Sequence, residues 1–479
     1  MEKDYSKIFL PSLKEARKRK NNKIEYYHFF IPPGLEQLGK NKTYYIKTYG
    51  CQGNIADSEK ISGIMEALAY QEASDEEHCD VLFFNTCAVR NTAEQRVFGE
   101  LGRLKGLKTK NPNLLIALCG CMPQEETTIA TVKEKYKHVD LIFGTHNIYN
   151  LPNLLYEAYT SAKQVLEIMS IEGQIVEKIP IKRGHSQKAW IDIMYGCDEF
   201  CTYCIVPYTR GKERSRQAED IIQEVKELVN LGYHEVTLLG QNVNAYGKDF
   251  SKSNYTFSNL LKDLSQTNIS RIRFTTSHPR DLDYETMQVM ASYHNIMPHL
   301  HLPVQSGSNK ILAKMNRKYT KEDYLAKIAQ LRSLIPDISL TTDIIVGFPG
   351  ESEEDFYETI DLVKKAKFEG AFTFIFSPRD GTPAAKYLDS ETNETKKSRL
   401  LELNKLINEG YAKGNARFEN EIVEVLVEGV SEQKAHLLTG YTPHNKLVNF
   451  EGSNDLIGKL VKVKIEKAYT WHLKGKLIE

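Results

Sequence analysis

Three of the eight cysteines of this chain lie in one short segment whose spacing suits a metal cluster. Cys197, Cys201 and Cys204 form the pattern Cys-x-x-x-Cys-x-x-Cys directly after the apolar run 190–196. Thiolate ligands suit iron–sulfur clusters or zinc, and three thiolates on a four-iron cluster leave one iron free to bind a small molecule. The alternative is a structural zinc site with a fourth ligand elsewhere in the chain. The place of the loop at the end of a predicted strand favours catalysis.

Three further cysteines, Cys51, Cys87 and Cys121, each follow a predicted strand. The strands are the apolar runs 43–50, 80–86 and 114–120. The carboxyl ends of parallel strands share one edge of a sheet, so these distant residues can meet there. Buried thiols are common in apolar strands and need no function. Three cysteines at equivalent positions nevertheless favour shared metal ligation.

The elements that must position these cysteines alternate between strand and helix. Short runs rich in β-formers alternate with the helical stretches 57–70 and 92–107, which predicts a parallel sheet with covered faces. A second series of six strand–helix units runs from Trp190 to about Ala385 and predicts an open, partial (β/α)6 barrel. Each predicted strand ends in glycine or polar residues, at the sheet edge where such folds place their chemistry.

The C-terminal region has a different pattern. Residues 391–413 predict one helix, and from Asn415 onward apolar residues alternate with period two between glycines, which predicts a small antiparallel β-barrel. Lys462 and Lys464 alternate with valines and should lie on one exposed face. Such a face often serves only solubility. Tyr469 and Trp471 beside it favour RNA binding.

These patterns predict an α/β chain of five segments. They are a partly disordered extension (1–41), an N-terminal parallel-sheet domain (42–155), a connector (156–187), a partial barrel (188–413) and a small β-barrel (416–479).

Composition limits the possible partners. Lys+Arg and Asp+Glu both number 63, so RNA binding would need a local basic surface rather than net charge. No apolar stretch approaches the roughly 18–20 residues that a membrane helix needs, and the N-terminus lacks the apolar region of a secretory signal. We therefore expect a cytoplasmic protein without a membrane partner.

The segment 197–204 resembles the signature of the radical S-adenosylmethionine (SAM) superfamily, with Tyr203 at its usual aromatic position. The resemblance implies that Cys197, Cys201 and Cys204 hold a 4Fe-4S cluster whose open iron binds the amino and carboxylate groups of SAM. An electron from the cluster would then cleave SAM to a 5′-deoxyadenosyl radical. Cofactors carry such chemistry because a side-chain base cannot activate so inert a C–H bond.

The first region resembles the N-terminal domain of the methylthiotransferase family. The similar segments are TYGCQGNIADSE, NTCAVRNTAEQRVFGELGRLK and GCMPQE. The resemblance implies a second, auxiliary 4Fe-4S cluster, held by Cys51, Cys87 and Cys121, that supplies sulfur. Cys121 rather than Cys119 matches the Gly-Cys-x-x-Gln motif. Cys79 precedes its strand, at the wrong end of the sheet.

The resemblance also implies a SAM pocket at the strand ends of the partial barrel. Gly240, Gln241 and Asn242 take the place where radical SAM proteins bind the amino group of methionine, and residues after later strands would shape the pocket. The cofactor-binding residues expected are Tyr203, Gly240, Gln241, Asn242, Ser277, Gln305 and Asp343. For His278, a structural role is at least as well supported as a catalytic one. The arginine-rich loop 207–216 is expected to contact RNA or SAM.

The C-terminal residues 416–479 are similar to the TRAM domain of RNA-modifying enzymes. The motifs look most like the family branch that methylthiolates carbon 2 of N6-isopentenyladenosine at position 37 of tRNA, with SAM as both methyl donor and radical source. Implied partners are the tRNA anticodon arm, an electron donor such as flavodoxin or ferredoxin, and a sulfur or cluster carrier, with the chain as a monomer. Alternatives are a methylthiotransferase for threonylcarbamoyladenosine in tRNA or for an aspartate of a ribosomal protein, or a non-catalytic zinc-stabilised RNA-binding protein.

Overall fold

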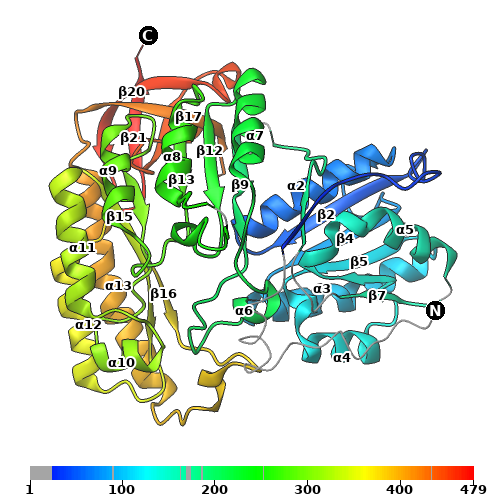
Figure 1. The fold of residues 1–479 in the computed structure, drawn as a ribbon, viewed down its shortest axis with the longest axis horizontal. Coiled ribbons are helices and arrows are strands. Elements are labelled where there is room, and N and C mark those ends of the chain that lie inside the picture. The colour runs from blue at the N-terminus through cyan, green and yellow to red at the C-terminus, as the bar shows by residue number, and fades with distance from the viewer. Residues whose placement is uncertain are drawn as a thin grey trace. The chain divides into compact units, whose positions relative to one another are not determined.

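A computed structural model describes residues 24–88, 91–161, 163–168, 174–184, 187–251, 253–432 and 434–478. Contacts divide the chain into two compact units (Figure 1). The first unit comprises residues 1–183, 195–198 and 204–214, and the second comprises residues 184–194, 199–203 and 215–479.

The first unit is built on a six-stranded parallel sheet with the strand order β3-β2-β4-β5-β6-β7. The strands are β2 (Thr43–Tyr49), β3 (Gln71–Glu72), β4 (Val81–Thr86), β5 (Leu115–Gly120), β6 (Leu141–Phe143) and β7 (Val165–Glu167). Every residue of β4 and β5 is buried, as expected for central parallel strands covered on both faces. The predicted parallel sheet is confirmed.

Helices cover both faces of this sheet because alternate side chains of a strand point to opposite faces. Phe83 of β4 packs with residues of α2 (Gln52–Ala67) and α5 (Leu151–Thr160). Its neighbour Phe84 packs with residues of α3 (Asn91–Lys110) and α4 (Glu126–Lys135). Two apolar cores therefore fix the sheet, and with it the edge where the strands end.

The first unit also contains strands where the sequence predicted an extension and a connector. β7 lies beyond residue 155, and β1 (Glu25–His28) pairs in parallel with β8 (Gln174–Glu177). After β1, Phe29 and Leu35 pack against the core beneath α2 and α5 although they follow no regular period. Residues 1–23, part of the extension predicted to be partly disordered, lie outside the described residues.

The second unit contains the predicted partial barrel. Two parallel three-stranded sheets, β13-β12-β9 and β14-β15-β16, are linked by a parallel bridge between Ile272 and Ile296. The strands are β9 (Lys188–Asp192), β12 (Glu235–Leu239), β13 (Arg271–Phe274), β14 (His299–His301), β15 (Ser339–Val346) and β16 (Ala371–Ile375). The intervening helices are α7 (Ala218–Asn230), α8 (Phe257–Ser265), α9 (Tyr284–Ser292), α10 (Asn309–Lys314), α11 (Lys321–Leu334) and α12 (Glu353–Ala366), followed by α13 (Asn393–Ala416) (Figure 1).

Local sequence explains where several of these helices begin. Thr320 and Asp323 form a capping box at the start of α11, in which each side chain accepts a hydrogen bond from the backbone N–H of the other residue. Ser352 and Asp355 do the same for α12. These caps satisfy backbone donors that the first helical turn leaves unpaired.

The C-terminal strands form a closed barrel in the order β17-β18-β19-β21-β20. They are β17 (Ile422–Ser431), β18 (Lys434–Tyr441), β19 (Leu447–Glu451), β20 (Leu460–Ala468) and β21 (Leu473–Leu477). All pairings are antiparallel except β19 with β21, which is parallel, so the prediction of an antiparallel barrel is wrong for this pair. A period of two indicates a strand but not the direction of its neighbour. The barrel core includes Val463 and Ile465.

A buried arginine joins the partial barrel to this small barrel within the second unit. Arg271 of β13 is fully buried and donates to the Tyr441 carbonyl (2.9 Å) and to the Glu424 carboxylate (2.9 Å). We expect Arg271→Ala to lower the free energy of unfolding by about 3–5 kcal/mol, because the Glu424 carboxylate loses its counterion and the carbonyls of Tyr441 and Glu424 lose a donor, whereas the buried Glu235 keeps Arg273 (3.0 Å). Urea denaturation of the full chain measures this change.

Lys459→Ala is the matched control, because the ion pair of Lys459 with Asp455 is exposed at both side chains. Solvent screening makes such pairs nearly neutral for stability, so the unfolding midpoint should hardly move. Equal effects of the two substitutions would contradict the role given to Arg271.

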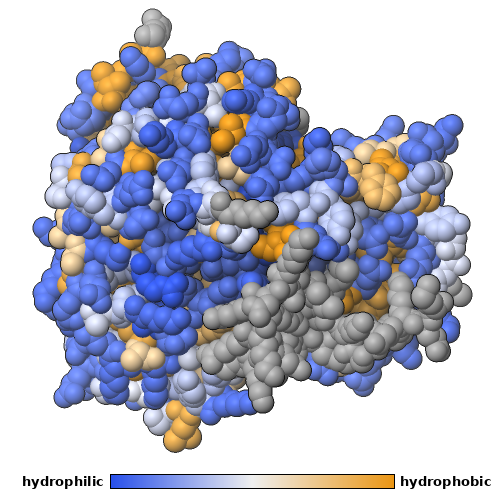
Figure 2. Space-filling model, viewed as in Figure 1, coloured by the Kyte–Doolittle hydropathy of each residue, from blue (hydrophilic) through white to orange (hydrophobic). Residues whose placement is uncertain are grey.

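The surface of the described residues combines hydrophilic and hydrophobic side chains. On the face shown in Figure 2, hydrophobic residues are scattered among a hydrophilic majority. Among the described helices, none combines the length and the apolar character that crossing a membrane requires.

Candidate active site

The first unit brings Cys51, Cys87 and Cys121 together at one edge of its sheet. Cys87 and Cys121 directly follow β4 and β5, and Cys51 follows β2 after one intervening glycine. These three strands are neighbours in the order β2-β4-β5. The thiol of Cys51 is hydrogen-bonded to that of Cys87, and Cys121 lies close enough for the charge of Cys51 to raise the pKa of its thiol. Residues up to 70 positions apart in the sequence therefore share one site.

Two buried asparagines hold the loops that carry these cysteines. The Asn54 amide donates to Asn85 Oδ1 (3.0 Å) and to the Thr86 carbonyl (3.2 Å), and the Asn85 amide donates to the Asn54 carbonyl (2.7 Å). The Thr86 carbonyl also accepts from the backbone N–H of Cys121 (2.8 Å). Hydrogen bonds between protein groups thus join the three loops. A buried polar group needs such a partner because it would otherwise pay the cost of losing its hydrogen bonds to water.

Glycines allow these loops to approach each other. Gly120 has a φ of +98°, and a Cβ there would lie 2.3 Å from the Thr86 carbonyl oxygen. A Cβ on Gly50 would lie 2.9 Å from the Cβ of Cys87. Any larger residue would therefore push apart the strand ends that carry the cysteines.

The charges around the three thiols differ. The hydrogen bond from Cys87, together with the positive charge of Arg210, outweighs burial and lowers the pKa of Cys51 to about 5. Burial raises the pKa of Cys121 to about 11, although Arg210 Nε donates to its sulfur (3.2 Å). Cys51 is therefore a thiolate at neutral pH, the form that binds iron. Three sulfur donors at one edge, one of them ionised, fit an iron–sulfur cluster.

The two remaining cysteines of this domain lie elsewhere. Cys119 is inside β5 in the apolar core, and burial raises its pKa well above the usual value. Cys79 precedes β4 at the opposite end of the strand, and burial raises its pKa to about 12. Both side chains pack in the apolar cores of the sheet, and their exclusion from the ligand set stays a prediction.

The cysteines of the triplet belong to both units. Cys197 and Cys204 lie in the first unit, where the backbone N–H of Cys197 donates to the Gly211 carbonyl (3.0 Å). Cys201 lies in the second unit and is buried, with Nη1 of the buried Arg317 3.5 Å from its sulfur. Their spacing within one loop remains the observation that predicts shared ligation.

Three of the predicted SAM-binding residues, Asn242, Ser277 and Gln305, follow strands β12, β13 and β14 of the partial barrel, and Asp343 lies within β15. The buried Asn242 donates to Asp281 Oδ2 (2.6 Å), while its Oδ1 and the Oγ of Ser277 are buried without a hydrogen-bond partner in the described structure. Gln305 pairs with β15, because its N–H donates to the carbonyl of Asp343 (2.9 Å). Unsatisfied buried polar atoms indicate a place for a polar ligand.

The other predicted pocket residues have different surroundings. A Cβ on Gly240 would lie 2.7 Å from Cγ of Met194, so the backbone after β12 approaches closely there, and Gln241 follows with a partly exposed side chain. Tyr203 packs instead against a separate apolar cluster, with its ring edge-on to Phe348 at 6.5 Å. The described contacts do not join Tyr203 to Asn242.

An ionic network that was not predicted from the sequence surrounds the part of the cysteine loop in the second unit. Arg280 bonds both Glu199 and Asp281, and His278 Nε2 lies 3.7 Å from Glu199. Burial lowers the pKa of His278, so this ring stays neutral at neutral pH. Arg280 and Lys248 already neutralise the two carboxylates, which favours an anchor for the loop over a cation site. The position of Glu199 between two cysteines was the one signal in the sequence.

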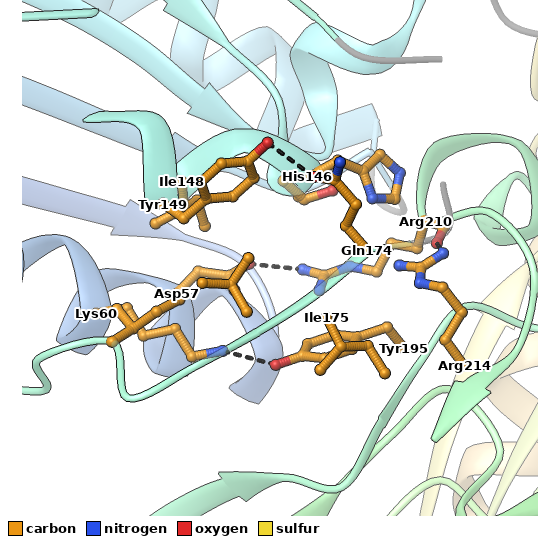
Figure 3. Close-up of a pocket in the computed structure, with 13 residues that line it drawn as sticks. Asp57, Lys60, His146, Ile148, Tyr149, Gln174, Ile175, Tyr195, Arg210 and Arg214 are labelled. Carbon is orange, nitrogen blue, oxygen red and sulfur yellow. Dashed lines mark hydrogen bonds and ion pairs between the residues drawn. The ribbon is translucent and has the colours of Figure 1, made fainter. Parts of the chain in front are cut away.

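The arginine-rich loop differs from the RNA contact predicted for it, whereas its contact with SAM stays a prediction. Its arginines 210, 214 and 216 are buried rather than presented to RNA. Arg210 contacts Cys121 and forms an ion pair with Asp57 (2.9 Å), and both contacts lie within the first unit. Figure 3 shows the Arg210–Asp57 pair lining a pocket together with Lys60, Tyr195 and Arg214.

The C-terminal barrel presents lysines and aromatic rings on its surface. Tyr469 stacks on His472 with 4.7 Å between ring centroids, Lys467 Nζ lies 5.3 Å from the Tyr469 ring, and Trp471 is 59% exposed. The exposed lysines of β20 and β21 are Lys462, Lys464, Lys467, Lys474 and Lys476. Cations that can pair with phosphates beside rings that can stack on bases are typical of RNA-binding surfaces.

Comparison with protein families matches three segments of the chain. Residues 43–144 match the Uncharacterized protein family UPF0004, residues 191–363 the Radical SAM superfamily, and residues 416–478 the TRAM domain. These segments include every cysteine of the two predicted ligand sets.

Several curated proteins are similar over the whole chain. A tRNA-2-methylthio-N(6)-dimethylallyladenosine synthase of Geobacillus thermodenitrificans is 53% identical over 99% of this chain and 91% of its own length. A protein of the same name from Bacillus subtilis is 51% identical over 100% of this chain and 95% of its own. Among solved structures, the radical SAM methyltransferase TsrM of Kitasatospora setae has a TM-score of 0.54 at 14% identity, covering 72% of this chain and 74% of that one, which supports the fold alone.

Proposed function

Because the chain belongs to the family of the tRNA-2-methylthio-N(6)-dimethylallyladenosine synthases, we propose that it attaches a methylthio group to carbon 2 of N6-isopentenyladenosine at position 37 of tRNA. The observation that carries this proposal is identity of 51–53% over essentially the full length of both chains. The protein is a radical SAM enzyme of the transferase class.

Cys197, Cys201 and Cys204 would hold the cluster that binds SAM. A 4Fe-4S cluster on three thiolates offers an open iron for SAM and the electron for its reductive cleavage. The protein would bind and orient the polar groups of SAM through Asn242 Oδ1 and Ser277 Oγ, which are buried and available for hydrogen bonds. The hydrogen bond to Asp281 fixes the orientation of the Asn242 amide.

Cys51, Cys87 and Cys121 would hold the auxiliary cluster through which sulfur is delivered. Support comes from their meeting at one sheet edge, from the thiolate character of Cys51 and from the hydrogen bonds that hold the loops. By this proposal, SAM serves both as methyl donor and as source of the radical, and the methylthio group replaces the hydrogen on the adenine ring.

The C-terminal barrel would bind the anticodon arm of tRNA with its exposed lysines and the rings of Tyr469 and Trp471. In RNA-binding proteins, basic side chains contribute affinity through the RNA backbone, and aromatic rings stack on unpaired bases. Turnover would need an electron donor such as flavodoxin or ferredoxin and a sulfur or cluster carrier. The protein would act in the cytoplasm as a monomer.

The substrate is tested by incubating anaerobically reconstituted protein with SAM, a reductant and three substrates in parallel. These are isopentenylated tRNA, threonylcarbamoylated tRNA and the ribosomal protein whose aspartate the third branch of the family modifies. Mass spectrometry of the digests should find a methylthio adduct only on the isopentenylated nucleoside. An adduct on either other substrate, with none on isopentenyladenosine, would assign the chain to another branch of the family.

A further inference from the structure

Arg210 connects the candidate auxiliary site to a buried charge. Its Nε donates to the sulfur of Cys121 (3.2 Å) and its Nη2 to Asp57 Oδ2 (2.9 Å). A Cβ on Gly53 would lie 3.5 Å from Arg210 Nη2 and 3.6 Å from Cys51 Sγ, so the guanidinium also lies beside the second cysteine. Figure 3 shows the Arg210–Asp57 contact and the Lys60–Tyr195 contact in the lining of one pocket.

The burial of this group limits what it can do. Arg210 and Asp57 are 6% and 3% exposed, so neither charge is screened by solvent. A buried charge is stable only when it is paired and its donors are satisfied. The Arg210 fork provides one donor to a carboxylate and another to a thiol sulfur, and arginine stays charged in proteins. The fork is therefore fixed by Asp57 and aimed at Cys121.

We propose that Arg210 is a positioning residue of the auxiliary site that orients Cys121 and sets the reduction potential of the cluster. This inference rests on the proposed function, which places a cluster on Cys51, Cys87 and Cys121. Net charge and hydrogen bonds to sulfur are among the factors that set the potential of a protein-bound iron–sulfur cluster. A cation that donates a hydrogen bond to a ligand sulfur stabilises the more negative, reduced state and raises the potential.

The two partners of the ion pair should therefore shift the potential in opposite directions. Arg210→Gln removes the cation and should make the potential more negative. Asp57→Asn removes the anion but leaves the guanidinium beside the sulfur, so the potential should become more positive. A purely structural role would disturb the loops in both variants and would not reverse the sign.

The test uses the full chain carrying Cys197→Ala, Cys201→Ala and Cys204→Ala, so that only the auxiliary cluster remains. The potential is measured by redox titration followed by electron paramagnetic resonance. Lys60→Gln is the matched control, because Lys60 lines the same pocket but donates to the Tyr195 hydroxyl (3.3 Å) rather than to a cysteine. It should shift the potential less than Arg210→Gln.

The outcomes separate this inference from the proposed function. A background protein that binds no iron would overturn the auxiliary cluster itself. About four irons with shifts of the same sign in both variants, or with none, would overturn the role of Arg210 alone. If Arg210→Gln loses its iron, the variants Asp57→Asn and Arg210→Lys provide the test. Asp57→Asn must make the reduction potential more positive than in the background protein. Arg210→Lys keeps the charge but not the two-pronged guanidinium, so its reduction potential must be more negative than that of the background protein.

Discussion

We expect the Cys201→Ala variant to form no 5′-deoxyadenosine from SAM but to keep about four of about eight irons. Removing one thiolate of the triplet leaves two, which cannot hold a four-iron cluster with a single open iron. Cys201 is also buried beside Arg317, so alanine leaves that guanidinium without its sulfur acceptor. The auxiliary site of the first unit does not use this residue. Iron and acid-labile sulfide counts, with chromatography of the nucleoside products, measure both effects.

Cys79→Ala is the matched control for this experiment. Cys79 is a buried thiol at the end of β4 opposite to the ligands, so it cannot reach the cluster that they would share. This variant should keep both the iron count and SAM cleavage. Formation of 5′-deoxyadenosine by Cys201→Ala at the wild-type rate would show that the triplet does not hold the radical cluster.

We expect the Cys87→Ala variant still to cleave SAM but to make no methylthiolated tRNA. Cys87 lies at the end of the central strand β4, where its thiol is hydrogen-bonded to Cys51. Alanine removes a ligand of the auxiliary cluster and also the hydrogen bond that favours the thiolate of Cys51. The triplet keeps its three thiolates. When both products are measured in the same reaction, 5′-deoxyadenosine should therefore still form while the methylthio nucleoside is absent.

Cys119→Ala offers the comparison within the same strand region. Cys119 lies two residues before Cys121 but its side chain packs in the apolar core of the first unit. Its loss should leave both products. Methylthiolated tRNA from Cys87→Ala would remove Cys87 from the sulfur-donating site. Loss of product in Cys119→Ala would mean that Cys119 of β5, and not Cys121 after it, is the ligand.

The sequence predicted the strands that carry the cysteines because central parallel strands read as continuous apolar runs. β4 and β5 are buried throughout, and each run ends at the residue where its loop begins. The three-residue strand β7 lay in a weakly patterned region and was missed. The parallel pairing of β19 with β21 was missed for another reason, since alternation carries no information on strand direction.

The environment of the cysteines was harder to predict than their positions. Asn54 and Asn85 are 31 residues apart, and no spacing rule pairs them. Arg210 lies in a charged loop for which contact with RNA or SAM was expected, yet it meets Asp57 from 153 residues away. Such contacts depend on tertiary packing, whereas local patterns report only which residues share a strand or a helix face.

The hydrogen bonds of Asn54 and Asn85 between the cysteine loops also affect how the first unit acquires iron. Small metal domains without such internal support unfold when the metal is removed, because binding supplies their folding free energy. Here the hydrogen bonds of Asn54, Asn85 and the Cys121 backbone N–H are made to other protein groups, and the loops rest on a sheet with two apolar cores. The loops therefore lose little conformational entropy when a cluster binds. After oxidative loss of iron, the first unit should stay folded, resist proteolysis and be able to bind a new cluster.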